Sequence, residues 1–405
     1  MSFLGDIIGQ CRIPERRREL RRLCQSFADC PKGLVFSGEN TRELFAGLEH
    51  TKIYLDQEES RVEQPGDCLP GDEHQIFCGR DITLETIVID SSDCGEFFFA
   101  NNYFFLRNRF LIHDRTGNER YGRAGPYRFR NLLFAPSRSS LWEIQRLSDI
   151  GRTIGPVTEL DAPVFFMSTY GNPNYYHWLF EPTLLSFRVC QEHVQFPDGM
   201  YYYVGDAMPK TLPRFVSDTC QALAIGKSQL VWGNCRAPRM IGGFASSPAG
   251  SAPSPRQVHF LRDLFLPAGG QPSTPKRIYV ARGNTRKRRV ANEQELIQAL
   301  RGHGVVPVVM DGLSIWEQAT LFHNAELIIA PNGAALTNLA FGRSGATVVE
   351  IHSGSYVNPS CYVLANLVGM NYCYAFAQAL GPNLDSHYTM DVAKMRRLLR
   401  RIGVH

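Results

Sequence analysis

The segment from Lys276 to His352 constrains the fold of this chain more than any other. Short apolar runs (RIYVA, VVPVVM, ELIIA and ATVVE) alternate in it with longer amphipathic segments. This alternation predicts βαβ units around a buried parallel sheet, and therefore an α/β fold. Ligands of such sheets bind outside the carboxyl ends of the strands. We therefore expect a binding site among the polar residues at the ends of these runs: 282–289, 311–314, 332–337 and 350.

The same rhythm begins earlier in the chain, at the apolar run PVFFMST (Pro163 to Thr169). A proline- and serine-rich stretch, SSPAGSAPSPRQ, and a second join near 267–275 separate the two α/β parts. We predict a first Rossmann-like lobe over 151–270 and a second over 271–405. The second lobe includes a C-terminal basic amphipathic helix, which we expect to pack back across the first lobe.

Residues 1–150 form a third predicted region. Its first 30 residues read as a basic helix, either packed on the body of the protein or in contact with anionic lipid or an acidic partner. From Lys32 to Leu147 the chain is rich in aromatic and β-branched residues, which indicates a β-rich accessory layer. Scaffold and acceptor recognition both remain open as roles for this layer.

Composition narrows the class of protein without naming a function. The 405 residues carry a formal net charge of +4, too little to indicate nucleic-acid binding by itself. No apolar run approaches the roughly 20 residues of a membrane helix. The 11 cysteines show no CxxC pair, which favours reduced thiols. We expect a cytoplasmic protein, with a possible peripheral contact to an anionic membrane surface.

Three motifs occur in order along the chain. The first is NYYHWLFE, from Asn174 to Glu181. The second and third consist of the following residues: Tyr279, Arg282, Arg288, Asn292 and Glu293, then Ser314, Gln318 and the run PNGAALTN from Pro331 to Asn338. Together they resemble glycosyltransferase family 61, over roughly Pro163 to Phe376.

The resemblance implies a two-lobed GT-B architecture, with the acceptor on the first lobe and the nucleotide-sugar on the second. It also implies an inverting hexosyl-, pentosyl- or N-acetylhexosaminyl-transferase. The donor would be a nucleotide-sugar, of the uridine diphosphate class, and the acceptor a hydroxyl of a polysaccharide or glycan. No cofactor other than the donor substrate is expected.

We predict that arginines, and not a metal ion, supply the positive charge of the donor site. Metal-dependent transferases commonly carry an Asp-x-Asp triplet, and none occurs in the sequence. Arg282 and Arg288 follow directly on an apolar run, and the planar guanidinium suits bidentate contact with phosphate. We predict that they bind the diphosphate and that catalysis is metal-independent. The alternatives are a solvated basic turn and a nucleic-acid patch.

The run PNGAALTN supplies further candidates for nucleotide-sugar binding. Small residues let the backbone approach a ligand, and a following helix offers free N–H groups. The candidates are Asn332, Gly333, Ala334, Thr337 and Asn338. The alternative is a tight turn in which the polar side chains bond the backbone locally. The family usually has histidine at position 332, and asparagine cannot carry a proton in its place.

Two more residues are assigned to the nucleotide-sugar. Glu350 ends an apolar run, where an acid commonly holds ribose hydroxyls; a surface salt bridge is the alternative. Ser314 with Glu317 fits a helix capping box, which is the favoured role, and a nucleotide contact is secondary.

His177 is the predicted general base. His177 and Glu181 lie four residues apart, on one face of a helix, and histidine titrates near neutral pH. The alternative is a buried histidine satisfied by Glu181. The neighbouring Asn174, Tyr176 and Trp178 are predicted to bind the acceptor. Zinc is excluded for this pair because no third ligand stands at a suitable spacing.

Two other functions stay open from the sequence. One is a degenerate member that binds a nucleotide or glycan without turnover, which Asn332 favours. The other is a nucleic-acid binder through Arg282 to Arg289, against which stand the small net charge and the absence of a recognised binding motif.

Overall fold

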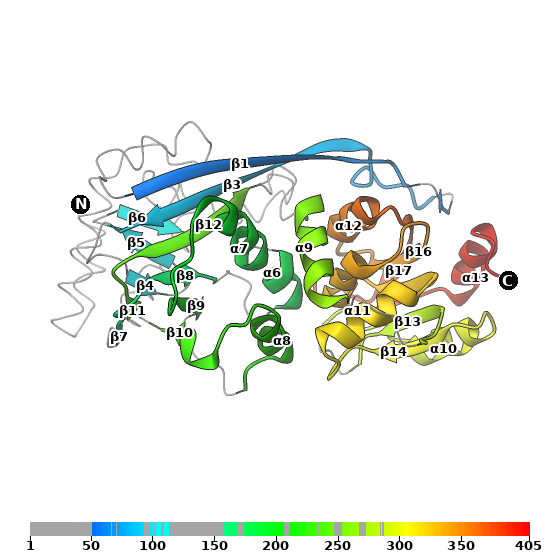
Figure 1. Ribbon diagram of the computed structural model, residues 1–405. Coiled ribbons are helices and arrows are strands. Elements are labelled where there is room, and N and C mark those ends of the chain that lie inside the picture. Colours follow the sequence, from blue (N-terminus) through cyan, green and yellow to red (C-terminus); the bar gives the residue numbers. More distant parts are fainter. Residues whose placement is uncertain are drawn as a thin grey trace, which may run out of the picture.

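A computed structural model describes the following residues: 51–65, 67–69, 71–92, 98–100, 103–106, 109–112, 158–167, 174–180, 182–205, 211–233, 235–246, 253–266, 273–283, 285 and 287–405. The described chain is built on two large sheets that lie side by side, with a long hairpin running along both (Figure 1). No helix in these residues is long and apolar enough to cross a membrane. The basic helix predicted within residues 1–30 lies outside the described residues.

The six-stranded sheet, here the N-terminal sheet, contains the first α/β segment. In spatial order its strands are β1 (Thr51–Val62), β3 (Arg80–Ser91), β12 (Met240–Ser246), β8 (Val164–Phe166), β9 (Tyr201–Gly205) and β10 (Leu230–Trp232). Its helical segments are α6 (Tyr175–Phe180), α7 (Pro182–His193), α8 (Arg214–Ala222), η2 (Lys227–Gln229) and α9 (Pro255–Phe265). The pairs from β12 to β10 are parallel, whereas β3 pairs antiparallel with both of its neighbours.

A small five-stranded sheet adjoins it. Its strands are β6 (Arg109–Ile112), β5 (Tyr103–Leu106), β4 (Phe98–Ala100), β11 (Cys235–Arg236) and β7 (Thr158–Glu159). The described part of the β-rich region predicted from Lys32 to Leu147 does contain strands, among them β1, β3, β4, β5 and β6. However, β3 pairs with β12 over seven residues, so the first strands extend the N-terminal sheet and do not form a separate accessory layer. The division at residue 150 drawn from the sequence does not coincide with a division of this sheet.

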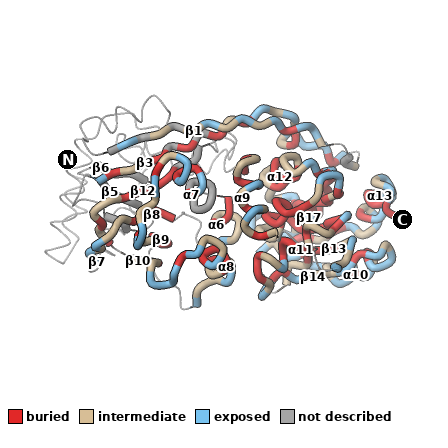
Figure 2. The backbone as a smooth tube through the Cα atoms, in the orientation of Figure 1, coloured by how far each residue is buried: buried red, intermediate tan, exposed pale blue. Residues whose placement is uncertain are grey.

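The C-terminal sheet confirms the βαβ pattern of residues 276–352. In spatial order its strands are β14 (Val306–Val309), β13 (Arg277–Ala281), β15 (Leu327–Pro331), β16 (Thr347–Ser353), β17 (Asn371–Ala379) and β18 (Tyr388–Thr389), with β2 (Asp67–Cys68) also paired to β17. Its helical segments are α10 (Glu293–Arg301), α11 (Ile315–Asn324), η3 (Ala334–Phe341), α12 (Ser360–Val368) and α13 (Val392–Arg401). The strands from β14 to β17 are parallel, and most residues of β15 and β16 are buried, as expected for strands covered on both faces (Figure 2).

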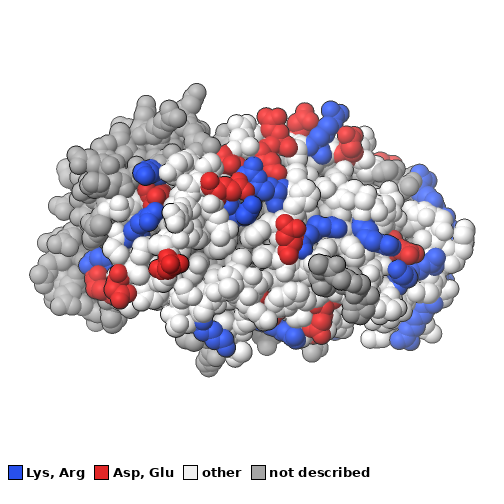
Figure 3. Space-filling view, viewed as in Figure 1, with Lys and Arg blue, Asp and Glu red and all other residues white. Residues whose placement is uncertain are grey.

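Helix α13 packs on the C-terminal sheet, so the prediction that it crosses back to the first lobe is wrong. Its buried residues Met395, Leu398 and Leu399 share a hydrophobic core with α10 and with strands of that sheet. The helix lies at the end of the molecule farthest from the N-terminal sheet, and Lys and Arg side chains gather there (Figures 1 and 3). An amphipathic pattern indicates a buried face without saying which sheet buries it.

The hairpin β1–β3 projects beyond the N-terminal sheet. Strand β3 pairs with β12 only from Ser91 to Glu85, while β1 and β3 stay paired with each other to Val62 and Arg80. We call residues 58–84 the arm. A two-stranded ribbon alone is only marginally stable in water, so the arm depends on what it contacts.

The arm ends on the C-terminal sheet. There β2 pairs with β17, and Asp72 forms an ion pair with Lys394 at 2.7 Å. Phe77, only 4% exposed, packs on the rings of Tyr374 and His352. The arm therefore connects the cores of both sheets, over a separation that no local sequence pattern reveals.

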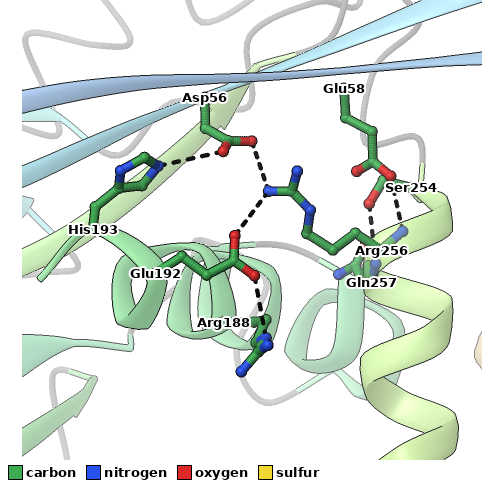
Figure 4. Close-up of polar contacts among 8 residues, drawn as sticks. All are labelled: Asp56, Glu58, Arg188, Glu192, His193, Ser254, Arg256 and Gln257. Atoms are coloured by element: carbon green, nitrogen blue, oxygen red, sulfur yellow. Dashed lines mark hydrogen bonds and ion pairs between the residues drawn. The ribbon is translucent and has the colours of Figure 1, made fainter.

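Charged side chains fix the base of the arm to the helices of the N-terminal sheet (Figure 4). Asp56 on β1 accepts a hydrogen bond from Arg256 of α9 at 2.8 Å and lies 3.3 Å from His193 of α7. Arg256 also lies 3.4 Å from Glu192, and its backbone N–H donates to Glu58 at 2.9 Å. Strand β1, α7 and α9 are thus held together where the arm leaves the sheet.

Candidate functional site

The C-terminal sheet has a topological switch point between β13 and β15. From β13 the chain passes through α10 to β14 on one side, and then through α11 to β15 on the other. In open sheets of this order, ligands bind at the carboxyl ends of the two strands where the order reverses. Arg282 follows β13 and Asn332 follows β15, so these two predicted site residues lie at the switch point.

Arg282 is fixed by backbone and side-chain contacts. Its backbone N–H donates to Oε1 of Glu293 at 3.1 Å. Its Nη1 donates to the backbone carbonyl of Asn332 at 2.8 Å, and its Nη2 donates to the carbonyl of Lys287 at 3.0 Å. The guanidinium is therefore held between the ends of the two strands.

Arg288 reaches the same asparagine. Its backbone has φ of 51°, in the left-handed region, and its N–H donates to the carbonyl of Asp385 at 3.1 Å. The guanidinium lies 4.5 Å from the centre of the Tyr356 ring, a cation–π contact, and Nη1 lies 3.4 Å from Oδ1 of Asn332. Asn332 therefore contacts both arginines, one through its backbone and one through its amide.

Neither of these two arginines forms an ion pair with a described carboxylate, although the charge of Glu293 acts on Arg282. No carboxylate of the described chain lies within 4.0 Å of either guanidinium, whereas the neighbouring Lys287 pairs with Asp385 at 2.8 Å. The Nε atoms of Arg282 and Arg288 are buried and lack a partner among the described residues. Burial and then the charge of Arg288 lower the pKa of Arg282. Two adjacent cations of this kind stabilise an anionic ligand.

Gly333 leaves room for the guanidinium of Arg282. A Cβ at this position would lie 2.1 Å from Nη1 of Arg282, so the guanidinium would have to move. The φ of Gly333, 172°, is ordinary extended backbone, so glycine serves here by its small size and not by its conformation. Ala334 follows as the first residue of η3 and is half-buried.

The polar side chains of η3, Thr337 and Asn338, form hydrogen bonds to other groups of the protein. The Thr337 hydroxyl donates to the carbonyl of Ala334, and the Asn338 amide donates to the carbonyl of Ala335 at 3.0 Å. Both side chains are fully buried. These two side chains therefore follow the alternative considered from the sequence, in which they bond the backbone of their own turn.

Asn338 also joins the first and third motifs. The hydroxyl of Tyr175 donates to its Oδ1 at 2.7 Å, and its amide donates to Oε1 of Gln318 at 2.8 Å. Helix α6 therefore lies against η3, and the motif NYYHWLFE contacts the C-terminal sheet. Ser314 forms the predicted capping box with Glu317 at the start of α11.

The residues predicted for acceptor binding and catalysis lie on α6. Asn174 caps this helix: its Oδ1 accepts the backbone N–H of Tyr176 at 2.9 Å. Trp178 is 1% exposed and donates to the Thr219 hydroxyl at 3.0 Å, so the structure assigns it to the core and its predicted contact with an acceptor does not fit. His177 is half-buried in the first turn, beside Tyr176. Glu181, its predicted partner, lies outside the described residues.

Glu350 lies deeper than the sequence suggested. Strand β16 continues to Ser353, so Glu350 is inside the strand and not at its end. The side chain is fully buried, and its two oxygens accept hydrogen bonds from Nδ2 of Asn332 at 2.5 Å and from the Tyr372 hydroxyl at 2.6 Å. In this position it offers no surface to a ribose, and a surface salt bridge is equally wrong.

Metal-ligand geometry is absent from the described part of the chain, where no three His, Cys, Asp or Glu side chains gather. The site that the described residues do form is a pair of arginines, an asparagine and a glycine at the switch point.

Comparison with known proteins places this site within a family. The model of the family described as glycosyltransferase 61 matches residues 175–349, which include the switch point and the motif on α6. Residues 175–349 form a glycosyltransferase 61 domain.

Three relatives of the domain carry the name "EGF domain-specific O-linked N-acetylglucosamine transferase". The protein from Xenopus laevis is 32% identical over 162 residues, covering 35% of this chain and 30% of the relative. The protein from Mus musculus is 28% identical over 166 residues, covering 36% and 31%. The protein from Bos taurus is 25% identical over 356 residues, covering 74% and 66%. The chain thus spans less than a third of the first two relatives.

Three residues that contribute to the site were not predicted from the sequence. Tyr356 stacks on Arg288, Tyr175 bonds Asn338, and Tyr372 bonds Glu350. Tyr175 stands within a recognised motif, and Tyr356 follows a glycine- and serine-containing loop after an apolar run, which was a usable signal. Tyr372 lies in an apolar run, and no residue near it in the sequence indicates a role in the site.

Proposed function

We propose that this chain is a glycosyltransferase that moves a sugar from a nucleotide diphosphate donor to a hydroxyl of a glycan or polysaccharide. The observation that carries the proposal is the pair Arg282 and Arg288 at the switch point of a glycosyltransferase 61 domain, where neither guanidinium forms an ion pair with a described carboxylate. A departing nucleoside diphosphate is an anion, and fixed guanidinium groups stabilise the charge that develops on it.

The finer parts of the proposal follow from the same arrangement. The two sheets correspond to the lobes of a GT-B transferase, with the diphosphate against the C-terminal sheet and the acceptor near α6. Two arginines supply the positive charge that a divalent metal supplies in other transferases. Inversion, with His177 as the base, and a uridine diphosphate donor rest on the family resemblance. The name of the relatives makes uridine diphosphate N-acetylglucosamine the first donor to test.

Asn332 stands where the family usually has histidine, and in the structure its amide connects Arg288 with Glu350. This use of the side chain supports a positional role in donor binding, for which no proton transfer is needed. Binding of the donor without turnover would identify the chain as a non-catalytic member of the family.

Titration calorimetry with uridine diphosphate and with uridine tests the proposal. A charge-assisted hydrogen bond contributes about 1.5–3 kcal/mol. Arg282→Ala or Arg288→Ala is therefore expected to weaken diphosphate binding by about ten- to a hundredfold and to leave uridine binding unchanged.

Lys287→Ala is the matched control, because it removes one positive charge from the same loop but one that is already paired with Asp385. Its affinity for uridine diphosphate is expected to stay within about threefold of the parent. Equal losses for uridine and uridine diphosphate in the arginine variants would show that the arginines support the fold and not the phosphates.

A further inference from the structure

Asn332 has four hydrogen-bonding groups, and each has a partner in the structure. Its backbone N–H donates to Ile351 at 2.8 Å, and its carbonyl accepts from Arg282 at 2.8 Å. Its Nδ2 donates to Glu350 at 2.5 Å, and its Oδ1 lies 3.4 Å from Nη1 of Arg288. The residue is only 8% exposed, so these contacts fix it.

The orientation of the Asn332 amide matters for Arg288. An amide has a donor end and an acceptor end, and a guanidinium has only donors. With Oδ1 toward Arg288 the contact is attractive. With the amide reversed, Nδ2 would face the guanidinium and two donors would oppose each other. The group that accepts a hydrogen bond from Nδ2 of Asn332 therefore fixes the amide with Oδ1 toward Arg288.

Glu350 is that acceptor, and it is itself held in place. The Tyr372 hydroxyl donates to its second oxygen at 2.6 Å, and His352 Nε2 lies 3.5 Å from the same oxygen. Burial lowers the pKa of His352, which favours the neutral ring. Phe77, from the arm, packs on the His352 and Tyr372 rings at 5.3 and 5.8 Å between centroids. The carboxyl group is thus held by Asn332, Tyr372 and His352, and Phe77 of the arm packs on the last two.

We propose that Glu350 is a positioning residue: it fixes the Asn332 amide so that Oδ1 and the backbone carbonyl of Asn332 hold Arg288 and Arg282 in place for a diphosphate. This inference rests on the proposed function, because it takes the two arginines as the diphosphate site. It replaces the ribose contact predicted from the sequence with an action through Asn332.

Four variants test the proposal by calorimetry with uridine diphosphate and uridine, together with unfolding midpoints. Glu350→Leu removes the acceptor and is expected to weaken diphosphate binding by about tenfold, the effect of one lost charged contact, while uridine binding stays within about threefold. Glu350→Gln keeps an acceptor oxygen for Asn332 and is expected to restore most of the affinity. Asn332→Ala is expected to reproduce the loss.

The double variant Glu350→Leu/Asn332→Ala separates positioning from general support of the fold. If Glu350 acts through Asn332, the double variant binds uridine diphosphate no more weakly than Asn332→Ala alone. Additive losses would overturn the proposal, as would an unchanged affinity of Glu350→Leu. If Glu350→Leu does not fold, Asn332→Ala and Glu350→Gln decide: the proposal is overturned if the first binds like the parent or the second loses tenfold.

Gln257→Leu is the matched control. Gln257 of α9 is 1% exposed and donates to the carbonyl of Leu179 of α6 at 2.8 Å, so its replacement also removes a buried polar group. It is expected to lower the unfolding midpoint and leave diphosphate affinity unchanged. Failure of the proposed function would look different, since the parent itself would then bind uridine diphosphate no better than uridine.

Discussion

The contact between Gly333 and Arg282 offers a sharp test of the site, because one methyl group should displace the guanidinium without disturbing the fold. In Gly333→Ala the added Cβ would lie 2.1 Å from Nη1 of Arg282 and 3.3 Å from its Cζ. The guanidinium must retreat by more than about one ångström to reach ordinary van der Waals distance. Its hydrogen bond to the carbonyl of Asn332, now 2.8 Å, cannot survive that movement.

The expected magnitudes for stability and for binding differ in this variant. Backbone at φ of 172° accepts alanine without strain. Replacing glycine by alanine lowers the conformational entropy of the unfolded chain, which by itself raises the free energy of unfolding by about 0.4–1 kcal/mol. The only close atoms belong to a flexible side chain, so the free energy of unfolding should change by no more than about 1 kcal/mol. Misplacing a charged contact costs about 1.5–3 kcal/mol, or about ten- to a hundredfold in affinity for uridine diphosphate.

Calorimetric titration and chemical denaturation of the same preparation measure both quantities. Gly302→Ala is the control, since a Cβ there lies 3.4 Å from its nearest neighbour, the carbonyl of Ala299. It should bind uridine diphosphate as the parent does. If Gly333→Ala also binds like the parent while Arg282→Ala loses affinity, Arg282 does not contact the phosphate from the position seen in the structure.

Three further predictions concern metal, the base and pH. Chelating agents should change the affinity for uridine diphosphate by less than about tenfold, or 1.4 kcal/mol; a larger loss in the titration means that a metal takes part. His177→Ala should keep donor binding and lower turnover by about 10²–10⁴-fold, whereas a purely structural histidine would lower the unfolding midpoint and spare the turnover of the folded fraction. Burial lowers the pKa of His352, so below the ordinary histidine pKa of about 6.5 the unfolded chain binds up to one proton more than the folded chain. The free energy of unfolding should therefore fall as the pH falls below that value, by up to about 1.4 kcal/mol per pH unit. Denaturation of the parent and His352→Gln from pH 7 to pH 5 checks this, and equal slopes would contradict it.

The part of the fold that was predictable from the sequence is the part whose signal is local. Strands buried on both faces read as short apolar runs, and β13, β14, β15 and β16 lie where these runs occur. Their carboxyl ends share one edge of the sheet, so Arg282, Asn332 and Gly333 could be brought together from the sequence alone. The capping box of Ser314 and Glu317 is equally local and is present at the start of α11.

The features that could not be predicted from the sequence depend on contacts between residues far apart in the chain. The arm pairs β2 with β17 and bonds Glu63 to Asn366 across 303 positions, and no nearby residue signals either contact. Glu350 looked like the end of a strand because a carboxyl group interrupts an apolar run. The strand continues because Asn332 and Tyr372 satisfy that carboxyl group. Trp178 was predicted to bind the acceptor because it stands in an aromatic motif, but the Thr219 hydroxyl accepts a hydrogen bond from its indole and so lets the ring lie in the core.

A structure of this protein with uridine diphosphate bound tests the central claim most directly. We expect the diphosphate oxygens within hydrogen-bond distance of the guanidinium groups of Arg282 and Arg288, beside Gly333 at the switch point between β13 and β15. A diphosphate bound elsewhere, with Arg282 and Arg288 contacting only protein groups, would contradict the assignment of this site.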